Sequence, residues 1–199
     1  MSNAVIAEPG VREGAVKVLS DNELTLLSDH LLRLDPQSRR DRFNGIVDDD
    51  FLIRYAAACA DEGVTVIGYI ERGEVHAAAE IHEPNRSPDA TPEIAFSVER
   101  HLRRKGVGSV LFAALLIEAK RAGYQSLRVT TGAQNDAMRA LAHKFGARLD
   151  FHHGELSGRI DLTTVKPPAV IPDATTPEYD LTHAIAGLNY ALQNPVPRL

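Results

Sequence analysis

The stretch EIAFSVERHLRRKGVGSVLFAALLIEA, residues 93–119, decides the fold. Residues 93–99 alternate between apolar and polar side chains, as a strand does, and 107–122 form an almost continuously apolar helix. Gly106 and Gly108 lie in the turn between them, where the absence of a side chain lets the backbone approach a ligand closely. The first N–H groups of a helix, together with its dipole, attract anions. The stretch therefore predicts a phosphate-binding turn.

Two common phosphate-binding motifs do not fit this turn. A Walker loop places its lysine after the second glycine, whereas Lys105 precedes Gly106. A Rossmann fingerprint needs a third glycine three residues after Gly108, and none is there. Arg103, Arg104 and Lys105 are expected to add positive charge at the rim.

Composition limits the class of protein. The chain has 199 residues, 44% of them hydrophobic, which suits one globular domain with an appendage. Its 22 basic and 27 acidic residues give a net charge of −5, so nucleic acid is not an expected partner. No apolar run is long enough for a membrane span, and the N-terminus lacks the plan of a signal peptide. The lone Cys59 in an apolar run is expected to be a buried structural thiol. A cytoplasmic protein is expected.

The order of predicted elements indicates an α/β fold. A strand at 16–20, two helices separated by a polar break around Pro36, a hairpin turning at 71–74 and the strand at 93–99 come first. After the long helix follow a strand, a helix capped by Asn135, and two more strands. This order predicts a mixed sheet with helices on its faces.

The ends of the chain differ from this core in composition. Residues 1–15 carry proline, glycine and scattered charge and are expected to form a flexible arm. Residues 167–199 combine a proline-rich linker with a short amphipathic helix, and are expected to form a tail on the domain at 16–166. This tail can cover the domain or join two chains in a homodimer.

Two motifs together resemble the GNAT acyltransferase superfamily. Arg103, Gly106 and Gly108 match [R/Q]-x-x-G-x-[G/A], and NDAMRALAHKFGARL at 135–149 matches the second family motif. The resemblance covers 16–165 and is closest to bacterial protein-lysine acetyltransferase-like domains. It implies a mixed, mostly antiparallel central sheet flanked by helices, with a C-terminal tail.

The resemblance also implies acetyl-CoA as cosubstrate. The pyrophosphate would bind the turn, the pantetheine arm would lie along the main chain of residues 96–98, and Asn135 would reach the thioester side. The implied coenzyme-binding residues are Phe96, Ser97, Val98, Arg103, Arg104, Lys105, Gly106, Val107, Gly108, Ser109 and Asn135.

Catalysis would be direct attack of a primary amine on the thioester in a ternary complex, and a base must take the proton of the ammonium. Glu93 resembles the glutamate at this place in the protein-lysine enzymes, and its alternative is a solvent-facing strand residue. Glu80 on the neighbouring strand is the second candidate base. Ala142 stands where many family members have a tyrosine that protonates the thiolate. This absence keeps open a second function, an acyl-CoA-sensing module without turnover.

The acceptor would be a small-molecule amine or a protein lysine. The segment LDPQSRRDRFNGIVDDDFLIRY at 34–55 occupies the place of the family's acceptor pocket. The aspartates at 48–50 suit the start of a helix better than a metal site, although they could attract a cationic amine. The adjacent His152 and His153 point apart on an extended chain, so no metal is expected.

Overall fold

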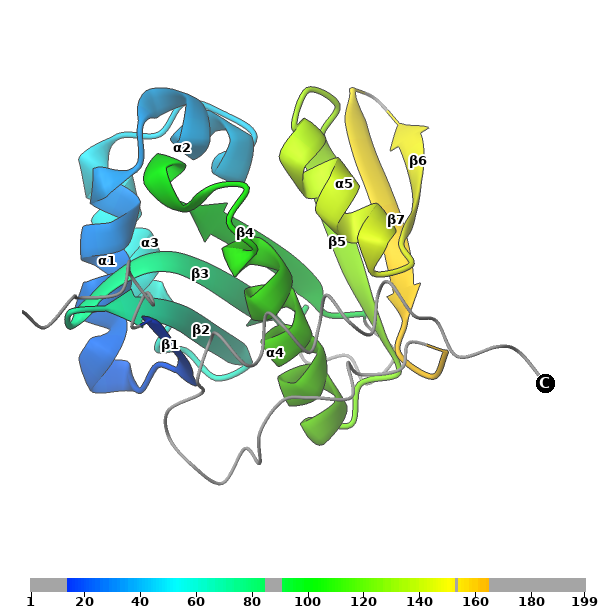
Figure 1. The fold of residues 1–199 in the computed structure, drawn as a ribbon, viewed down its shortest axis with the longest axis horizontal. Helices are drawn as coiled ribbons and strands as arrows, with labels where there is room; N and C mark the ends of the chain where they lie inside the picture. The colour runs from blue at the N-terminus through cyan, green and yellow to red at the C-terminus, as the bar shows by residue number, and fades with distance from the viewer. Residues whose placement is uncertain (1–13, 85–90, 153, 165–199) are drawn as a thin grey trace, which may run out of the picture.

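The computed structural model describes residues 14–84, 91–152 and 154–164 (Figure 1). Residues 1–13 of the arm expected at 1–15 and the whole tail expected at 167–199 lie outside these residues, and residues 14 and 15 belong to a strand rather than to the arm. Along the chain the elements are β1 (Gly14–Val18), η1 (Asp21–Glu23), α1 (Leu24–Arg33), α2 (Pro36–Phe43), α3 (Asp49–Ala58), β2 (Val64–Glu71), β3 (Glu74–His82), β4 (Glu93–Val98), η2 (Arg100–Leu102), α4 (Val107–Arg121), β5 (Ser126–Gly132), α5 (Asp136–Lys144), β6 (Arg148–His152) and β7 (Glu155–Asp161).

All the strands join one sheet, in the order β1-β2-β3-β4-β5-β7-β6. Every neighbouring pair is antiparallel except β4 and β5, which are parallel. The β2–β3 hairpin turns through Arg72 and Gly73, whose φ angles of 53° and 82° are those of the tight turns that suit a twisted hairpin. The predicted mixed, mostly antiparallel sheet is confirmed.

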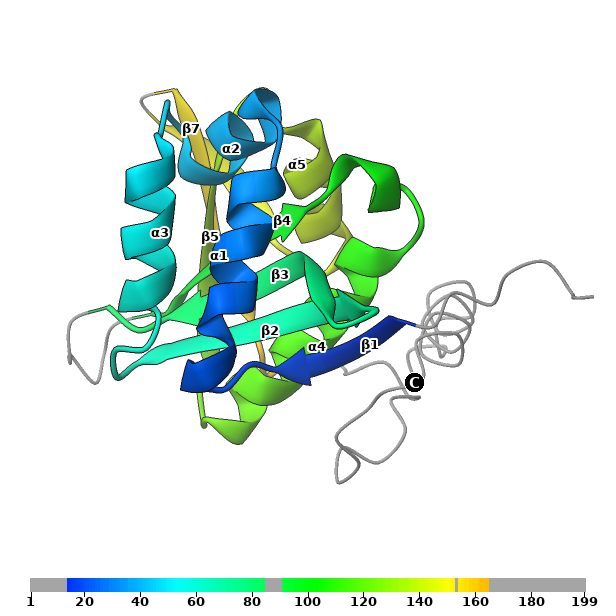
Figure 2. The same ribbon diagram turned by 90° about the vertical axis from the view of Figure 1, so that its left-hand side faces the viewer.

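Helices cover both faces of the sheet and create two cores (Figure 2). Neighbouring residues of β2 serve different faces: Val66 packs with α1 and α3, and Ile67 packs with α4. Alternation along a strand makes this division possible. α4 is buried on most of its surface, as its apolar sequence predicts, and Phe112 is fully buried. Cys59 lies in the core between the sheet and helices α1 and α3, where burial raises the pKa of its thiol to about 12.

The expected polar break around Pro36 is wrong, because these residues form helix α2. Asp35 caps the helix by accepting a 3.0 Å hydrogen bond from Ser38 N, and Pro36 occupies the first turn. Only Ser38 of α2 is buried, so the helix has no apolar stripe by which its period could be recognised. β1 also begins at Gly14, two residues before the strand predicted at 16–20.

Helix α3 uses the aspartates at its start as the sequence predicts. Asp48 accepts a 2.7 Å hydrogen bond from Phe51 N, and Asp49 pairs with Arg39 Nη1 at 2.6 Å. They therefore stabilise a helix start and a contact with α2. In the part of the chain that the structure describes, no helix has the length and apolar character needed to cross a bilayer.

Candidate active site

Strands β4 and β5 pair over two positions only and then diverge. Glu93 lies opposite Arg128 and Ile94 opposite Val129, and the parallel ladder ends there (Figure 1). β3 continues to pair with β4 as far as Val98, so only the β5-facing edge of β4 loses its partner. An extended ligand arm can hydrogen-bond to such a free edge as an additional strand does.

The turn before α4 is a source of main-chain hydrogen-bond donors. Arg104 and Gly106 have φ angles of 59° and 87°, and among the described residues the N–H groups of 104–106 donate to no main-chain carbonyl. Val107 and Gly108 add the first N–H groups of the 15-residue α4. The turn therefore has the donors and the helix dipole that an anion site needs.

Arg103 and Ser109, also expected in this site, are already engaged with protein groups. The N–H of Arg103 donates to Arg100 O at 3.3 Å, and its guanidinium donates to Val98 O at 3.1 Å and to Ser38 Oγ at 2.7 Å. Arg103 thus fastens α2 to the end of β4. Ser109 Oγ accepts a 3.0 Å hydrogen bond from Lys144 Nζ, which brings to this region a cation that sequence reasoning missed.

A cavity of about 860 Å³ lies between this turn, the edge of β4 and α5. Phe96 and Val98 line it from β4, and Phe96 stacks on Phe112 with ring centroids 4.9 Å apart. Ser97 points to the other face of the sheet, where its Oγ lies 2.8 Å from His30 Nε2. Only the main chain of Ser97 can therefore contribute here.

Asn135 closes the end of this cavity nearest α2. Its Oδ1 accepts a 3.0 Å hydrogen bond from Met138 N, which confirms the predicted helix cap, and its Nδ2 donates to Asp41 O at 3.4 Å. Ala142, on the same helix, is fully buried. No proton donor therefore stands at the position of the usual tyrosine.

A second cavity, of about 340 Å³, opens beside the first. The two share Phe96, Asn135 and Met138, so they meet where β4 and β5 diverge. The second cavity has both carboxylates and aromatic rings in its wall. Besides the three shared residues, its lining includes Asp41, Phe43, Tyr55, His82, Glu93, Thr130 and Glu155.

Glu80 is fully buried behind the second cavity at the centre of a polar network. Its Oε2 accepts hydrogen bonds from Arg42 Nη2 at 2.8 Å, from His82 Nε2 at 2.9 Å and from the Tyr55 hydroxyl. Burial opposes a charge on Glu80, but the guanidinium of Arg42 and these hydrogen bonds outweigh it and lower the pKa of the carboxyl to about 2. Glu80 is therefore an ionised carboxylate without direct access to the cavity.

Arg42, Tyr55 and His82 of this network all line the second cavity, and among them His82 carries an imidazole, the most common side-chain base. Its side chain is 29% exposed and lines the cavity wall. An ionised carboxylate only accepts hydrogen bonds, so Nε2 carries a hydrogen in this contact, and the tautomer that satisfies it has its lone pair on Nδ1. Nδ1 makes no hydrogen bond to a described residue. Sequence reasoning missed His82, whose signal was its place two residues after Glu80 on one strand face.

Glu93 lies at the entrance of the second cavity. Its side chain is 39% exposed and pairs with Arg128 Nη2 at 3.0 Å. The structure thus brings both predicted carboxylates near the second cavity, Glu93 at its surface and Glu80 behind it.

Comparison with known proteins agrees with this arrangement. The model of the acetyltransferase (GNAT) family matches residues 27–147. The GNAT domain of S. lividans PAT is 17% identical, with a TM-score of 0.63 over 74% of this chain and 90% of that one. Ribosomal-protein-alanine N-acetyltransferase from Brucella melitensis is 17% identical, with a TM-score of 0.58 over 73% and 98%. YncA from Salmonella typhimurium, solved with its cofactor acetyl-CoA, is 19% identical, with a TM-score of 0.57 over 79% and 99%.

The family model covers more than half of the chain, and the solved structures share its fold. The diverging parallel pair and the turn before α4 both border the first cavity, which meets the second. The chain belongs to the acetyltransferase (GNAT) family.

Proposed function

We propose that this protein is an N-acetyltransferase that moves the acetyl group of acetyl-CoA to a primary amine by direct attack. The observation that carries the proposal is the meeting of the two cavities at Phe96, Asn135 and Met138. A donor in the first cavity and an acceptor in the second would face each other across this junction. Effective catalysis needs such an approach of the reacting atoms.

The donor would be held chiefly by main chain. The amides of 104–108 would bind the pyrophosphate, with Arg104 and Lys144 of the cavity wall and Lys105 of the turn adding positive charge. The unpaired edge of β4 would accept the pantetheine arm alongside residues 96–98. Neither contact needs a particular side chain, which agrees with Ser97 and Arg103 being engaged elsewhere.

His82 would act as the base, with Glu80 positioning it. As the amine attacks the thioester carbonyl, its proton passes to Nδ1 of His82, and the carboxylate of Glu80 stabilises the imidazolium that results. In this pairing Glu80 orients and stabilises His82 and does not touch the substrate, since Glu80 itself is fully buried. Glu93 would instead attract the cationic amine from the entrance.

The acceptor cavity suits a cation with an apolar stem. Its carboxylates, Asp41, Glu93 and Glu155, would attract an ammonium, since the one guanidinium among its lining residues, that of Arg42, is paired with Glu80. The rings of Phe43 and Tyr55 form an apolar wall. Both a protein lysine and a small alkylamine have this character. The coenzyme thiolate would leave without a side-chain acid at Ala142 and take its proton from water, since a thiol pKa of about 8.5 permits this.

Thiol release from acetyl-CoA, measured against a panel of alkylamines and lysine peptides, tests the proposal. We expect release with at least one acceptor, and a fall of about 10²–10⁴ in kcat for His82→Gln, because a positioned base contributes that much. The Kd of acetyl-CoA should stay within about twofold of wild type, since His82 lies outside the first cavity.

His143→Gln is the matched control, because His143 is an exposed histidine of α5 outside both cavities. It should leave kcat unchanged. Tight binding of acetyl-CoA without release for any acceptor would support the sensing module instead. A fully active His82→Gln with an inactive Glu93→Gln would return the role of base to Glu93.

A further inference from the structure

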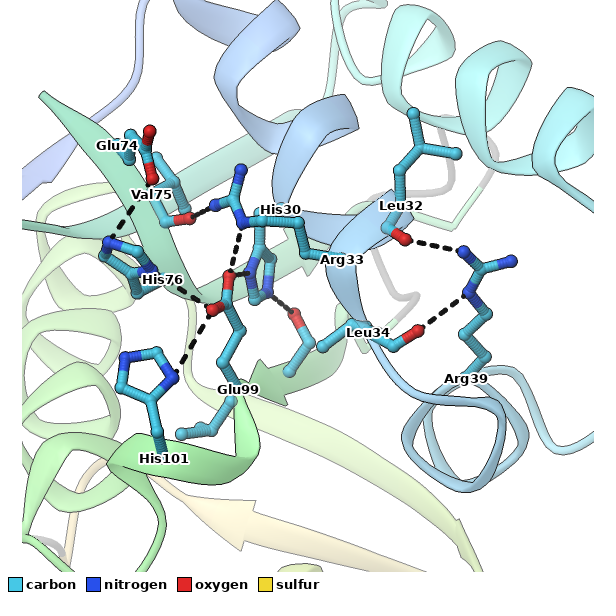
Figure 3. A network of polar contacts seen from close by, with 12 residues as sticks. His30, Leu32, Arg33, Leu34, Arg39, Glu74, Val75, His76, Glu99 and His101 are labelled. Atoms are coloured by element: carbon cyan, nitrogen blue, oxygen red, sulfur yellow. Dashed lines mark hydrogen bonds and ion pairs between the residues drawn. The ribbon is translucent and has the colours of Figure 1, made fainter.

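A second polar network surrounds Glu99, on the sheet face that carries α1 (Figure 3). His76 Nδ1 lies 3.1 Å from Glu99 Oε2, and His101 Nδ1 lies 3.5 Å from the same oxygen. These histidines come from β3 and η2, and their rings meet edge to face with centroids 5.3 Å apart. Two imidazole nitrogens thus converge on one carboxylate oxygen.

We infer that His76, Glu99 and His101 form a binding site for a divalent transition-metal ion, zinc being the one whose ligand preference fits best. One donor atom from each residue lies within 4.8 Å of the other two. Zinc binds imidazole and carboxylate ligands at about 2.0–2.2 Å, so neighbouring ligand atoms around a tetrahedral ion lie about 3.3 Å apart. The separations of 3.1 and 3.5 Å bracket this value.

Other residues hold these three ligands in place. Glu99 Oε1 accepts hydrogen bonds from His30 Nδ1 at 3.1 Å and Arg33 Nε at 3.0 Å, which turns Oε2 toward the two histidines. Glu74 Oε2 lies 3.7 Å from His76 Nε2, where it can orient that ring. Such outer partners are what fix and strengthen the ligands of natural metal sites.

The site is open to solvent on one side. The His101 side chain is 53% exposed, whereas those of His76 and Glu99 are 16% and 11% exposed. An ion can therefore enter past His101 and keep water in its fourth position.

The location of the site gives it a consequence for coenzyme binding. Glu99 and His101 flank the first residue of η2, which leads directly into the turn at 103–108. Glu99 N also donates to His76 O at 3.1 Å, so β3 is already joined to the end of β4. An ion would extend this link to η2 and fix the start of the turn whose amides we assign to the pyrophosphate. Zinc is therefore expected to tighten acetyl-CoA binding.

Zinc titration of the metal-stripped, full-length protein tests the site, with a chromophoric chelator as competitor. We expect one equivalent to bind to wild type, and the affinity to fall by about tenfold or more in His101→Ala and in His76→Ala, since even outer partners of a metal are worth about 10–100-fold. His101→Ala is the principal variant because its exposed side chain contributes little to packing. Replacement by Co²⁺ should give d–d absorption that both variants lose.

His143→Ala controls for adventitious binding at a surface histidine and should bind zinc as wild type does. The absence of a stoichiometric zinc site in wild type would overturn the inference. Equal zinc affinity in His101→Ala and wild type would also overturn it, because the ion would then lie elsewhere.

The consequence for the turn has its own measurement. The Kd of coenzyme A is compared in zinc-loaded and metal-stripped protein, and linkage requires that coenzyme A tighten zinc binding by the same factor. Equal affinities would refute the coupling. Zinc binding itself needs neither coenzyme nor acceptor, so its failure is distinguishable from a failure of the proposed acetyl transfer.

Discussion

The two cavities are built in opposite ways. In the cavity that we assign to the coenzyme, the groups offered to a polar ligand are chiefly main-chain N–H groups of the turn before α4, while side chains of 96–109 and of the facing helix α5 form its walls. The acceptor cavity is formed by side chains that α2, α3, β3, β4, β5, α5 and β7 bring together. A main-chain site tolerates changes of side chain and depends on backbone conformation, whereas a side-chain site depends on each partner in its network. Substitutions in the two cavities should therefore differ in their effects.

Loss of the Glu80 carboxylate should have the largest effect on stability. Glu80→Gln leaves the guanidinium of Arg42 buried without its counter-ion, and breaking a buried pair in this way costs about 3–5 kcal/mol. Glu93→Gln breaks an ion pair whose Glu93 and Arg128 side chains are 39% and 48% exposed, and should cost about 0–1 kcal/mol. Urea denaturation of the two variants measures both values. Equal losses would contradict the contrast between buried and surface carboxylates.

The same carboxylate should make stability depend on acid pH. The folded state lowers the pKa of Glu80 from 4.5 to about 2, so it favours the ionised form. This stabilisation is fully present above the unfolded pKa and is lost as pH falls from about 4.5 through about 2. Thermal denaturation between these pH values should show a smaller slope in Glu80→Gln than in wild type. An unchanged slope would show that Glu80 does not titrate in this range.

Backbone conformation should dominate in the coenzyme cavity. Gly106→Ala and Gly123→Ala both place alanine at a positive φ, 87° and 84°, and each should cost about 1–2 kcal/mol of stability. Gly123 ends α4 away from the turn, and an added Cβ there meets nothing within 4 Å. Only Gly106→Ala should weaken acetyl-CoA binding in calorimetry, by about tenfold or more, equivalent to about 1.4 kcal/mol.

Gly108→Ala separates the effect of a side chain on coenzyme binding from its effect on backbone strain. A Cβ at Gly108 would lie 3.6 Å from Leu141 Cδ2, an ordinary contact, so the fold should keep its stability. Weaker acetyl-CoA binding without a change in unfolding free energy is the expected result. Native affinity would mean that the coenzyme does not approach this part of the turn.

Asn135 should show a smaller, mixed effect, because it belongs to both cavities. Asn135→Ala removes the cap of α5 and should cost about 1 kcal/mol of stability. Asp48→Ala removes the corresponding cap of α3, outside both cavities, at a similar cost. A rise in the KM for acetyl-CoA in Asn135→Ala but not in Asp48→Ala would show that Asn135 contacts the ligand in addition to capping α5. Equal KM values in the two variants would mean that Asn135 acts only as the cap of α5.

Lys105 should contribute least, as a charge at the rim. Lys105→Ala should weaken coenzyme A binding by less than about 1 kcal/mol, and the difference should shrink as salt is raised from about 0.01 to 1 M. Arg159→Ala, an exposed cation of β7, is the matched control and should have no effect. A salt-independent loss would mean that Lys105 makes a buried contact.

The sequence was sufficient for the parts of the fold that local rules determine. The strand alternation at 93–99, the positive φ of Gly106 and the cap at Asn135 are each contained in a few consecutive residues and are observed, whereas Gly108 lies in the first turn of α4 and not before it. Helix α2 was missed because only Ser38 is buried and the apolar period is absent. The cap signal Asp35–Pro36 was present in the sequence and would have identified it.

The acceptor site was harder to predict for a different physical reason. Tyr55 and Glu80 are 25 residues apart in sequence and meet only after α3 packs on the sheet. Glu80 looked like a base because carboxylates accept protons, but its burial beside Arg42 could not be read from one strand. His82 lacked any motif, and its role follows only from contact with Glu80.

A crystal structure of the acetyl-CoA complex tests the central claim most directly. It should show pyrophosphate oxygens within hydrogen-bonding distance of the main-chain N–H groups of 105–108. The thioester should lie at the junction beside Phe96, with His82 facing it across the acceptor cavity. Diphosphate bound anywhere else, for example on the exposed arginines of β5 and β7, would contradict the account.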